Sequence, residues 1–176
     1  MSNVKIIATN SNSNVTGRNV AISDATGVRV RLDWPPRSPV PVLAGGEGPK
    51  TIALTGEVAD GTVLTSGTSP AMVRTAVERI TTARREAGRD GAHEVVVFLN
   101  AEFGEGAAER MEAEFDAWGF EGERRFAALG DEEAVAATVR EIIDAGATTV
   151  LLQSRSAEPD LDGYVRAVAR VQALLA

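Results

Sequence analysis

The chain has 176 residues, of which 44% are hydrophobic and 24% charged, a balance typical of a globular protein long enough to bury a full core. Its net charge of -7, with no basic patch, argues against nucleic acid as a partner. The absence of cysteine excludes disulfides, thiol nucleophiles and thiolate metal sites.

The first 38 residues differ in character from the rest. MSNVKIIATNSNS has too little charge and apolar length for a signal peptide, and no stretch reaches the ~20 apolar residues of a membrane span, so we expect a cytoplasmic protein. Two β-like runs flank a Thr26-Gly27 turn and predict a β-hairpin. Asp33-Trp34-Pro35-Pro36 predicts a rigid connector. We therefore expect an N-terminal extension over residues 1–38 and one domain over residues 39–176.

Short apolar runs, rich in valine and leucine and without polar alternation, recur through the second part of the chain. Strands buried on both faces of a parallel sheet have this pattern. The predicted strands are Val40–Ala44, Thr62–Thr65, Val95–Ala101 and Thr148–Gln153.

Helical patterns alternate with these runs. One helix begins at Pro49, and a second begins with Ser69 as N-cap and Pro70 at the first helical position, ending near Gly88. Further helices are predicted over Gly106–Ala117, from Asp131 to a stop at Gly146, and over Asp162–Leu175. The fold class is therefore α/β, a (βα)4 parallel sheet with right-handed crossovers.

A glycine cluster, Gly45, Gly46 and Gly48, connects the first predicted strand to the first predicted helix. Glycine lets the backbone approach a ligand closely, and the N–H groups of a helix N-terminus favour a phosphate. Lys50 adds positive charge and Thr51 a hydroxyl, while Pro49 needs no donor at that position. Two interpretations follow: a phosphate site, or glycines that only permit a tight strand-to-helix turn.

The order and spacing of several motifs are more specific than the cluster alone. Residues 31–73, RLDWPPRSPVPVLAGGEGPKTIALTGEVADGTVLTSGTSPAMV, resemble the C-terminal half of the luciferase-like monooxygenase family. GRD before the third strand, DAGATTVLLQ at the fourth and the final helix also fit, and NVTGRNVAISDATGVRVRL resembles the family's hairpin insertion. These enzymes are (β/α)8 barrels that use FMN or the deazaflavin F420, and the sequence looks closest to the actinobacterial F420-dependent branch.

The resemblance implies a fold and a site. The chain would form a half TIM-barrel-like sheet, corresponding to barrel strands five to eight. The cofactor phosphate would be bound by Gly45, Gly46, Glu47, Gly48, Pro49, Lys50 and Thr51. The substrate side, at the C-terminal ends of the later strands, would include Thr65, Ser66, Gly67, Asn100, Glu102, Gln153, Ser154 and Arg155. Catalytic residues are unknown, because the family's first four strands supply most of them.

A half-barrel leaves two sheet edges and one sheet face uncovered, and both are liabilities in water. We therefore expect a homodimer or other homo-oligomer, or a partner chain that supplies a complementary half-barrel. Two functions remain open at this point. The chain is a flavin- or F420-dependent oxidoreductase acting on a small molecule, or a non-catalytic binding or structural module that has lost the redox chemistry.

Individual residues do not decide between the oxidoreductase and the non-catalytic module. His93, the only histidine, precedes a strand and is expected at the surface, away from the site. A lone histidine without a carboxylate cluster also argues against a metal site. Glu102 and Glu105 are expected to be exposed, and the Glu121–Arg125 run is expected to be a solvated connector. Arg155 is a candidate clamp for an anionic substrate or a phosphate.

Overall fold

The computed structural model describes residue 36 and residues 38–176, and the statements below refer to them. The predicted hairpin and most of the proline-rich connector lie outside the described residues. The elements, in chain order, are β1 (Leu43–Gly45), α1 (Pro49–Val58), β2 (Gly61–Leu64), α2 (Pro70–Glu86), β3 (Glu94–Phe103), α3 (Ala107–Trp118), the 3-10 helix η1 (Gly122–Arg124), β4 (Ala128–Gly130), α4 (Glu132–Asp144), β5 (Thr149–Gln153) and α5 (Leu161–Leu175).

All strand pairs in the described sheet are parallel, which confirms the predicted α/β class. β1 pairs with β2, and β2 pairs with the first part of β3. β5 pairs with the middle of β3, where Val96 aligns with Thr149 and Asn100 with Gln153. The prediction of four strands is incomplete, because β4 is a fifth strand that pairs with residues 101–103 at the end of β3.

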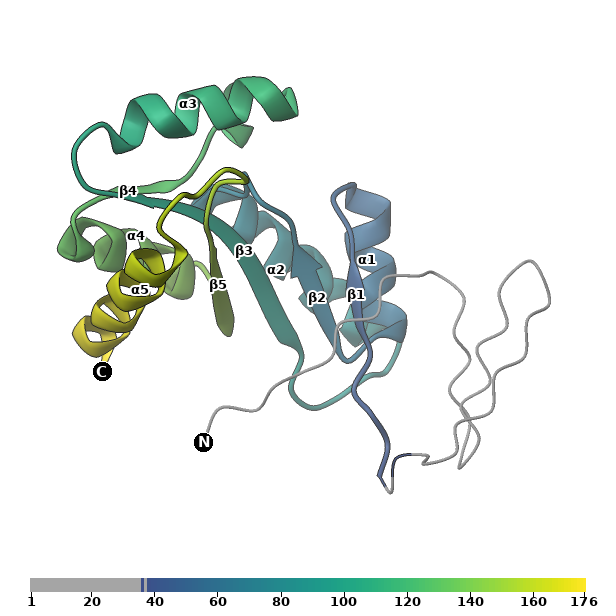
Figure 1. The fold of residues 1–176 in the computed structure, drawn as a ribbon. Helices are drawn as coiled ribbons and strands as arrows, with labels where there is room; N and C mark the ends of the chain where they lie inside the picture. The colour runs from purple at the N-terminus through teal and green to yellow at the C-terminus, as the bar shows by residue number, and fades with distance from the viewer. Residues whose placement is uncertain (1–35, 37) are drawn as a thin grey trace.

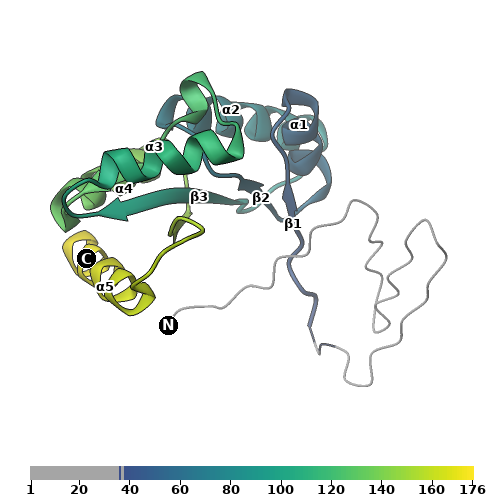
Figure 2. The same cartoon turned by 45° about the horizontal axis from the view of Figure 1, so that its top comes forward.

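The main hydrophobic core lies between the sheet and the helices on one of its faces. Figures 1 and 2 show α1, α2 and α4 beside one another on that face. Alternate residues of β3, namely Val95, Val97, Leu99 and Ala101, point into this core and are at most 5% exposed. Helices α1, α2 and α4 contribute Ile52, Val73, Ala76, Ile80, Val135, Val139 and Ile142, and α5 adds Val171. Burial of this apolar face is what holds the helices on the sheet.

The opposite face of the sheet carries a smaller cluster formed by Leu43, Val63 and Val96, with Phe98 partly buried beside it. On this face Leu151 of β5 is 38% exposed. The prediction that every strand is buried on both faces therefore holds for β2, whose residues are all buried, and is wrong for β5.

Local capping rules predict several helix starts correctly. Ser69 and Asp131 are the N-caps of α2 and α4, and their side chains accept hydrogen bonds from the N–H groups of Met72 and Ala134. Asp160 caps α5 in the same way. No helix in the described part of the chain has the length and apolar character needed to cross a membrane.

Candidate functional site

The C-terminal ends of β1 and β2, the edge at which parallel α/β folds bind ligands, are followed by two loops that meet η1. The first loop is the predicted phosphate loop, Gly45–Thr51. Gly45, Glu47, Gly48, Lys50 and Thr51 are all exposed there. The loop is therefore open to a ligand, and the side chains of the described residues do not seal it.

The backbone of this loop does not require its glycines. None of Gly45, Gly46 and Gly48 has a positive φ, and Gly48 has φ -77 and ψ 152, a conformation that any residue adopts. Packing requires only Gly46, where a Cβ would lie 2.8 Å from the Thr51 methyl group. A Cβ at Gly45 would meet no atom within 4 Å, and one at Gly48 only the Thr51 hydroxyl at 4.0 Å. Neither backbone conformation nor packing among the described residues accounts for glycine at positions 45 and 48.

Helix α1 begins differently from α2, α4 and α5. Its N-cap is Gly48, with no side chain to accept a hydrogen bond from the first turn, and the first turn contains no acidic residue. The first N–H groups of a helix have no partner within the helix, and here no cap replaces one. Together with the exposed Lys50, they make this end electropositive.

An ion pair connects the Gly45–Thr51 loop to the 3-10 helix η1. Arg124 of η1 donates hydrogen bonds from Nη1 to Glu47 Oε2 at 2.8 Å and from Nη2 to Glu47 Oε1 at 3.3 Å. Thr65 donates to Glu47 Oε1 at 2.7 Å. The hydrogen bonds from Arg124 and Thr65 hold the pKa of the Glu47 carboxyl below its usual value. The charge of Glu47 is thereby neutralised beside the α1 N-terminus.

The sequence pattern does not identify Arg124 as a residue of this site. Its guanidinium also donates to the Ser66 carbonyl oxygen at 3.1 Å and lies 4.9 Å from the centroid of the Phe120 ring. The interpretation of Glu121–Arg125 as a solvated connector is therefore wrong for its two arginines, since Arg125 pairs with Glu112 and Asp116. Only the chain fold brings Arg124 next to Glu47, which lies 77 positions earlier.

The predicted substrate-side residues fall into two groups. Thr65, Ser66 and Gln153 belong to the first, near the phosphate loop, where Ser66 donates from its hydroxyl to Gln153 Oε1 at 3.2 Å. Gly67 is buried next to them, and Asn100, the register partner of Gln153, is 2% exposed. Neither the amide nitrogen nor the amide oxygen of Asn100 has a hydrogen-bond partner among the described residues.

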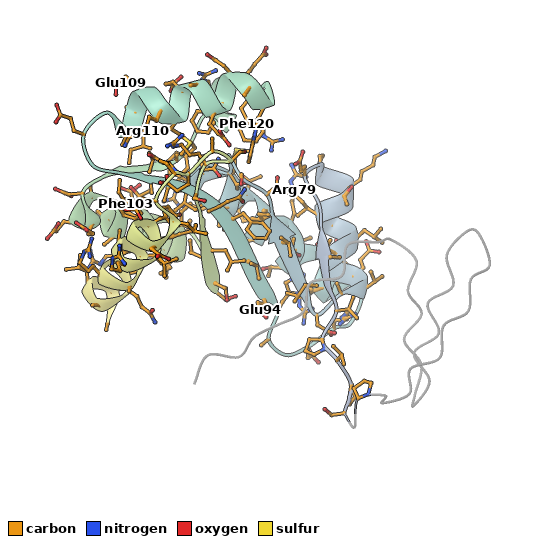
Figure 3. The ribbon with its side chains drawn as sticks, in the orientation of Figure 1. Arg79, Glu94, Phe103, Glu109, Arg110 and Phe120 are labelled. Carbon is orange, nitrogen blue, oxygen red and sulfur yellow. The ribbon has the colours of Figure 1, made fainter. Side chains whose placement is uncertain are left out.

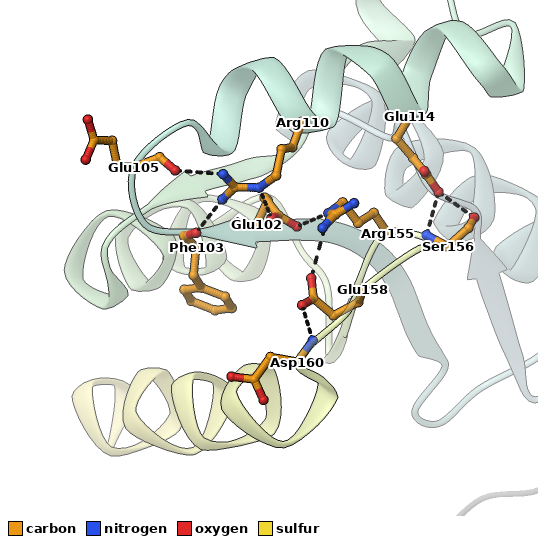
Figure 4. A network of polar contacts seen from close by, with 9 residues as sticks. All are labelled: Glu102, Phe103, Glu105, Arg110, Glu114, Arg155, Ser156, Glu158 and Asp160. Atoms are coloured by element: carbon orange, nitrogen blue, oxygen red, sulfur yellow. Dashed lines mark hydrogen bonds and ion pairs between the residues drawn. The ribbon is translucent and has the colours of Figure 1, made fainter.

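Glu102 and Arg155 form the second group, at the C-terminal ends of β3 and β5 (Figure 4). Ser154 directly precedes Arg155 in the chain. Glu102 accepts a hydrogen bond from Arg110 Nε at 2.6 Å, and Arg155 Nε lies 3.3 Å from its other oxygen. Glu102 is only 4% exposed, so the expectation of an exposed carboxylate is wrong here and correct for Glu105. The two arginines allow this carboxylate to be buried.

His93 lies at the opposite end of the sheet, before Glu94, which Figure 3 places far along β3 from Phe103. It is half-buried, not at the surface as expected. Arg84 donates to its Nδ1 at 3.1 Å, and its Nε2 lies 2.8 Å from the Thr62 hydroxyl. Burial and the nearby Arg84 lower the pKa of His93 to about 4. It therefore stays neutral and links β2 to α2. No cluster of metal-ligating side chains is found among the described residues.

Comparison with known protein families assigns this chain to one of them. The family model for luciferase-like monooxygenases matches residues 11–118, more than half of the sequence, and the chain belongs to that family. None of the curated proteins compared with the sequence matches it significantly. The family match confirms the resemblance stated from the glycine-rich and strand motifs.

Solved structures show the same fold. An F420-dependent secondary alcohol dehydrogenase, solved with an F420–acetone adduct, matches with a TM-score of 0.67 and 16% identity over 89% of this chain and 57% of its own. The coenzyme F420-dependent tetrahydromethanopterin reductase from Methanopyrus kandleri matches with a TM-score of 0.58 and 18% identity, over 74% of this chain and 49% of its own. EDTA monooxygenase from Chelativorans sp. BNC1 matches with a TM-score of 0.58 and 17% identity, over 87% of this chain and 50% of its own.

The chain thus spans about half the length of these structural relatives. Its parallel sheet and helices correspond to part of a luciferase-like TIM barrel, as the sequence predicts.

Proposed function

We propose that this chain binds the phosphate of a flavin or F420 cofactor at Gly45–Thr51 and belongs to a luciferase-like oxidoreductase acting on a small molecule. Family membership and the F420-dependent structural relatives support this class of cofactor. When bound, the cofactor supplies the hydride-transfer chemistry, and the protein supplies binding, orientation and electrostatics.

One observation carries the proposal: Gly45 and Gly48 are glycine where neither backbone conformation nor packing demands it. The residues of the loop fit a phosphate. The N–H groups at the start of α1 donate to it, Lys50 adds a positive charge, and the Thr51 hydroxyl is exposed nearby. Arg124 neutralises Glu47, which would otherwise repel an anion at this position.

The second function left open by the sequence, a non-catalytic binding or structural module, differs from the first in cofactor binding. We test this with the absorption spectrum of the purified full chain and titrations with FMN and with F420. We expect micromolar binding of at least one, weakened several-fold by Lys50→Ala. Arg79→Ala, which removes an exposed cation from α2, is the matched control and should leave the affinity unchanged. If neither cofactor binds, the module is the correct function.

We also propose that the chain acts as a homodimer or other homo-oligomer, or beside a complementary half-barrel chain. Within the described residues β1 pairs only with β2, and β5 only with β3. The face opposite the helices exposes Leu151. Both features favour a partner that covers this edge and this face.

A further inference from the structure

A cavity of about 580 Å³ lies between the end of β3, the start of α4, the β5–α5 loop and α5. This volume is within the range of small-molecule sites. Its apolar walls include Phe103, Pro159 and Ala167, and its polar walls include Glu102, Arg155 and Tyr164. The cavity lies two strands away from the Gly45–Thr51 loop across the sheet, so it is a separate feature.

Buried polar atoms without a hydrogen bond concentrate on this cavity. Among the described residues, only five have such side-chain atoms, and three of the five line it. The atoms are Glu102 Oε2, Arg155 Nε and the Tyr164 hydroxyl. The first two lie 3.3 Å apart as an ion pair, whereas the Tyr164 hydroxyl has no partner among the described residues. Buried polar groups are almost always hydrogen-bonded, so the Tyr164 hydroxyl indicates that a partner is missing.

Arg155 is the available cation of the cavity. Its side chain is 17% exposed, and its shortest contacts with acidic groups are ion pairs made by Nε, 3.3 Å from Glu102 and 3.7 Å from Glu158. No hydrogen bond from its two Nη atoms is found within the described part of the chain, and the buried Nε makes no hydrogen bond either. Two free Nη groups in one plane match a carboxylate geometrically.

The other two arginines of the cavity are already engaged. Arg110 donates to Glu102 and to the carbonyl oxygens of Glu105 and Phe103, as Figure 4 shows. Arg170 is paired with Glu132, with Nη2 2.6 Å from Oε1. An anion entering the cavity therefore meets Arg155 as its cationic partner.

Tyr164 provides a second donor. Its ring packs edge-to-face on Phe103 with a centroid distance of 5.5 Å, which fixes its position. Burial, and then the negative charges of Glu102 and Glu158, raise the pKa of its hydroxyl. The hydroxyl therefore stays protonated and is available as a hydrogen-bond donor.

The remaining charges define the ligand. Glu102 and Glu132 are neutralised by Arg110 and Arg170. Glu158, whose side chain is 14% exposed, also lines the cavity and lies 3.7 Å from Arg155 Nε. Asp131 and Asp160 accept hydrogen bonds at the N-termini of α4 and α5, which offset their charge in part. With this many carboxylates on its wall, the cavity tolerates one negative charge better than two, which disfavours a phosphate dianion.

We propose that this cavity binds a small organic monocarboxylate, with its carboxylate on the Arg155 Nη atoms and the Tyr164 hydroxyl and its apolar part against Phe103, Pro159 and Ala167. The inference goes beyond the proposed function, because it holds whether or not the Gly45–Thr51 loop binds a cofactor.

Calorimetric titration of the full chain with 3-phenylpropionate, its amide and 3-phenylpropylamine tests the proposal. We expect the carboxylate to bind about tenfold or more tightly than the amide, since a charge-assisted hydrogen-bonded pair is lost in the amide. Equal binding of acid and amide, preference for the amine, or no binding of any of the three overturns the proposal.

Variants assign the effect to its residues. Arg155→Gln should abolish the preference for the acid, and Tyr164→Phe should reduce it several-fold. Arg166→Gln removes an exposed cation of α5 that does not line the cavity, and should leave the preference unchanged. Because Arg155→Gln can impair folding beside Glu102, Tyr164→Phe is the second variant. It keeps the ring contact with Phe103, and an unchanged acid preference in this variant contradicts the assignment.

Discussion

Gly48→Asp separates the stability of the first helix from phosphate binding, because the two should change in opposite directions. Aspartate is a preferred N-cap residue and gains a few tenths of a kcal/mol over glycine, and a carboxylate at a helix N-terminus adds about 0.3–1 kcal/mol. Gly48 already has the extended backbone of an N-cap, and a Cβ there meets nothing closer than 4.0 Å. For a chain of this size the gain corresponds to a rise in Tm of roughly 1–4 °C.

Phosphate binding should fall in the same variant. Two unit charges about 4 Å apart repel by ~4 kcal/mol at the effective dielectric of a protein surface. Half of that is sufficient for more than a tenfold loss of affinity. Thermal unfolding followed by circular dichroism measures the first effect, and titration with FMN measures the second.

Gly48→Asn is the matched control, because asparagine caps a helix as well as aspartate without adding charge. It should raise the Tm slightly and weaken FMN binding less than Gly48→Asp does. A Gly48→Asp variant that binds FMN as tightly as the wild type, or as tightly as Gly48→Asn, refutes the assignment of a phosphate to this loop.

Helix packing, the pKa of His93 and the oligomeric state can each be tested by a further experiment. Gly56→Ala should destabilise the protein by about 1–3 kcal/mol in urea unfolding, because its Cβ would lie 2.8 Å from the Ile80 carbonyl oxygen where α1 packs on α2; an unchanged midpoint contradicts this packing. His93 has a pKa near 4 when folded and an ordinary value of 6.5, so its contribution to stability is complete above pH 6.5 and is lost as the pH falls toward 4. His93→Gln should lack that part of the pH dependence in urea unfolding, and equal slopes for both proteins would exclude it. Sedimentation at micromolar concentration should give an oligomer; a monomer that binds no dye specific for apolar surface is the contrary result.

The sequence predicts the fold where local rules decide it. Ser69-Pro70 and Asp131 mark helix starts because capping depends on a few adjacent residues. The buried strands are recognisable because they are apolar throughout. The sequence pattern does not predict β4, because this strand has only three residues. It forms because β3 extends beyond the residues that pair with β5 and leaves an edge to which β4 can pair.

The candidate site is less predictable, because its polar residues pair across long stretches of chain. Glu47 contacts Arg124 only after the sheet and η1 have formed. Glu102 contradicts the usual exposure of glutamate because Arg110, on the following helix, and Arg155, after β5, surround it. Its alternation with Phe98 and Asn100 on β3 places all three on the face opposite the main core, a signal that was present in the sequence.

The most direct test of the account compares the affinity of the full chain for FMN with that for riboflavin, which carries the same ring system without the phosphate. The account predicts that FMN binds at least tenfold more tightly and that Gly48→Asp removes most of this difference. Equal affinities for the two compounds, in the wild type and in the variant, would contradict it.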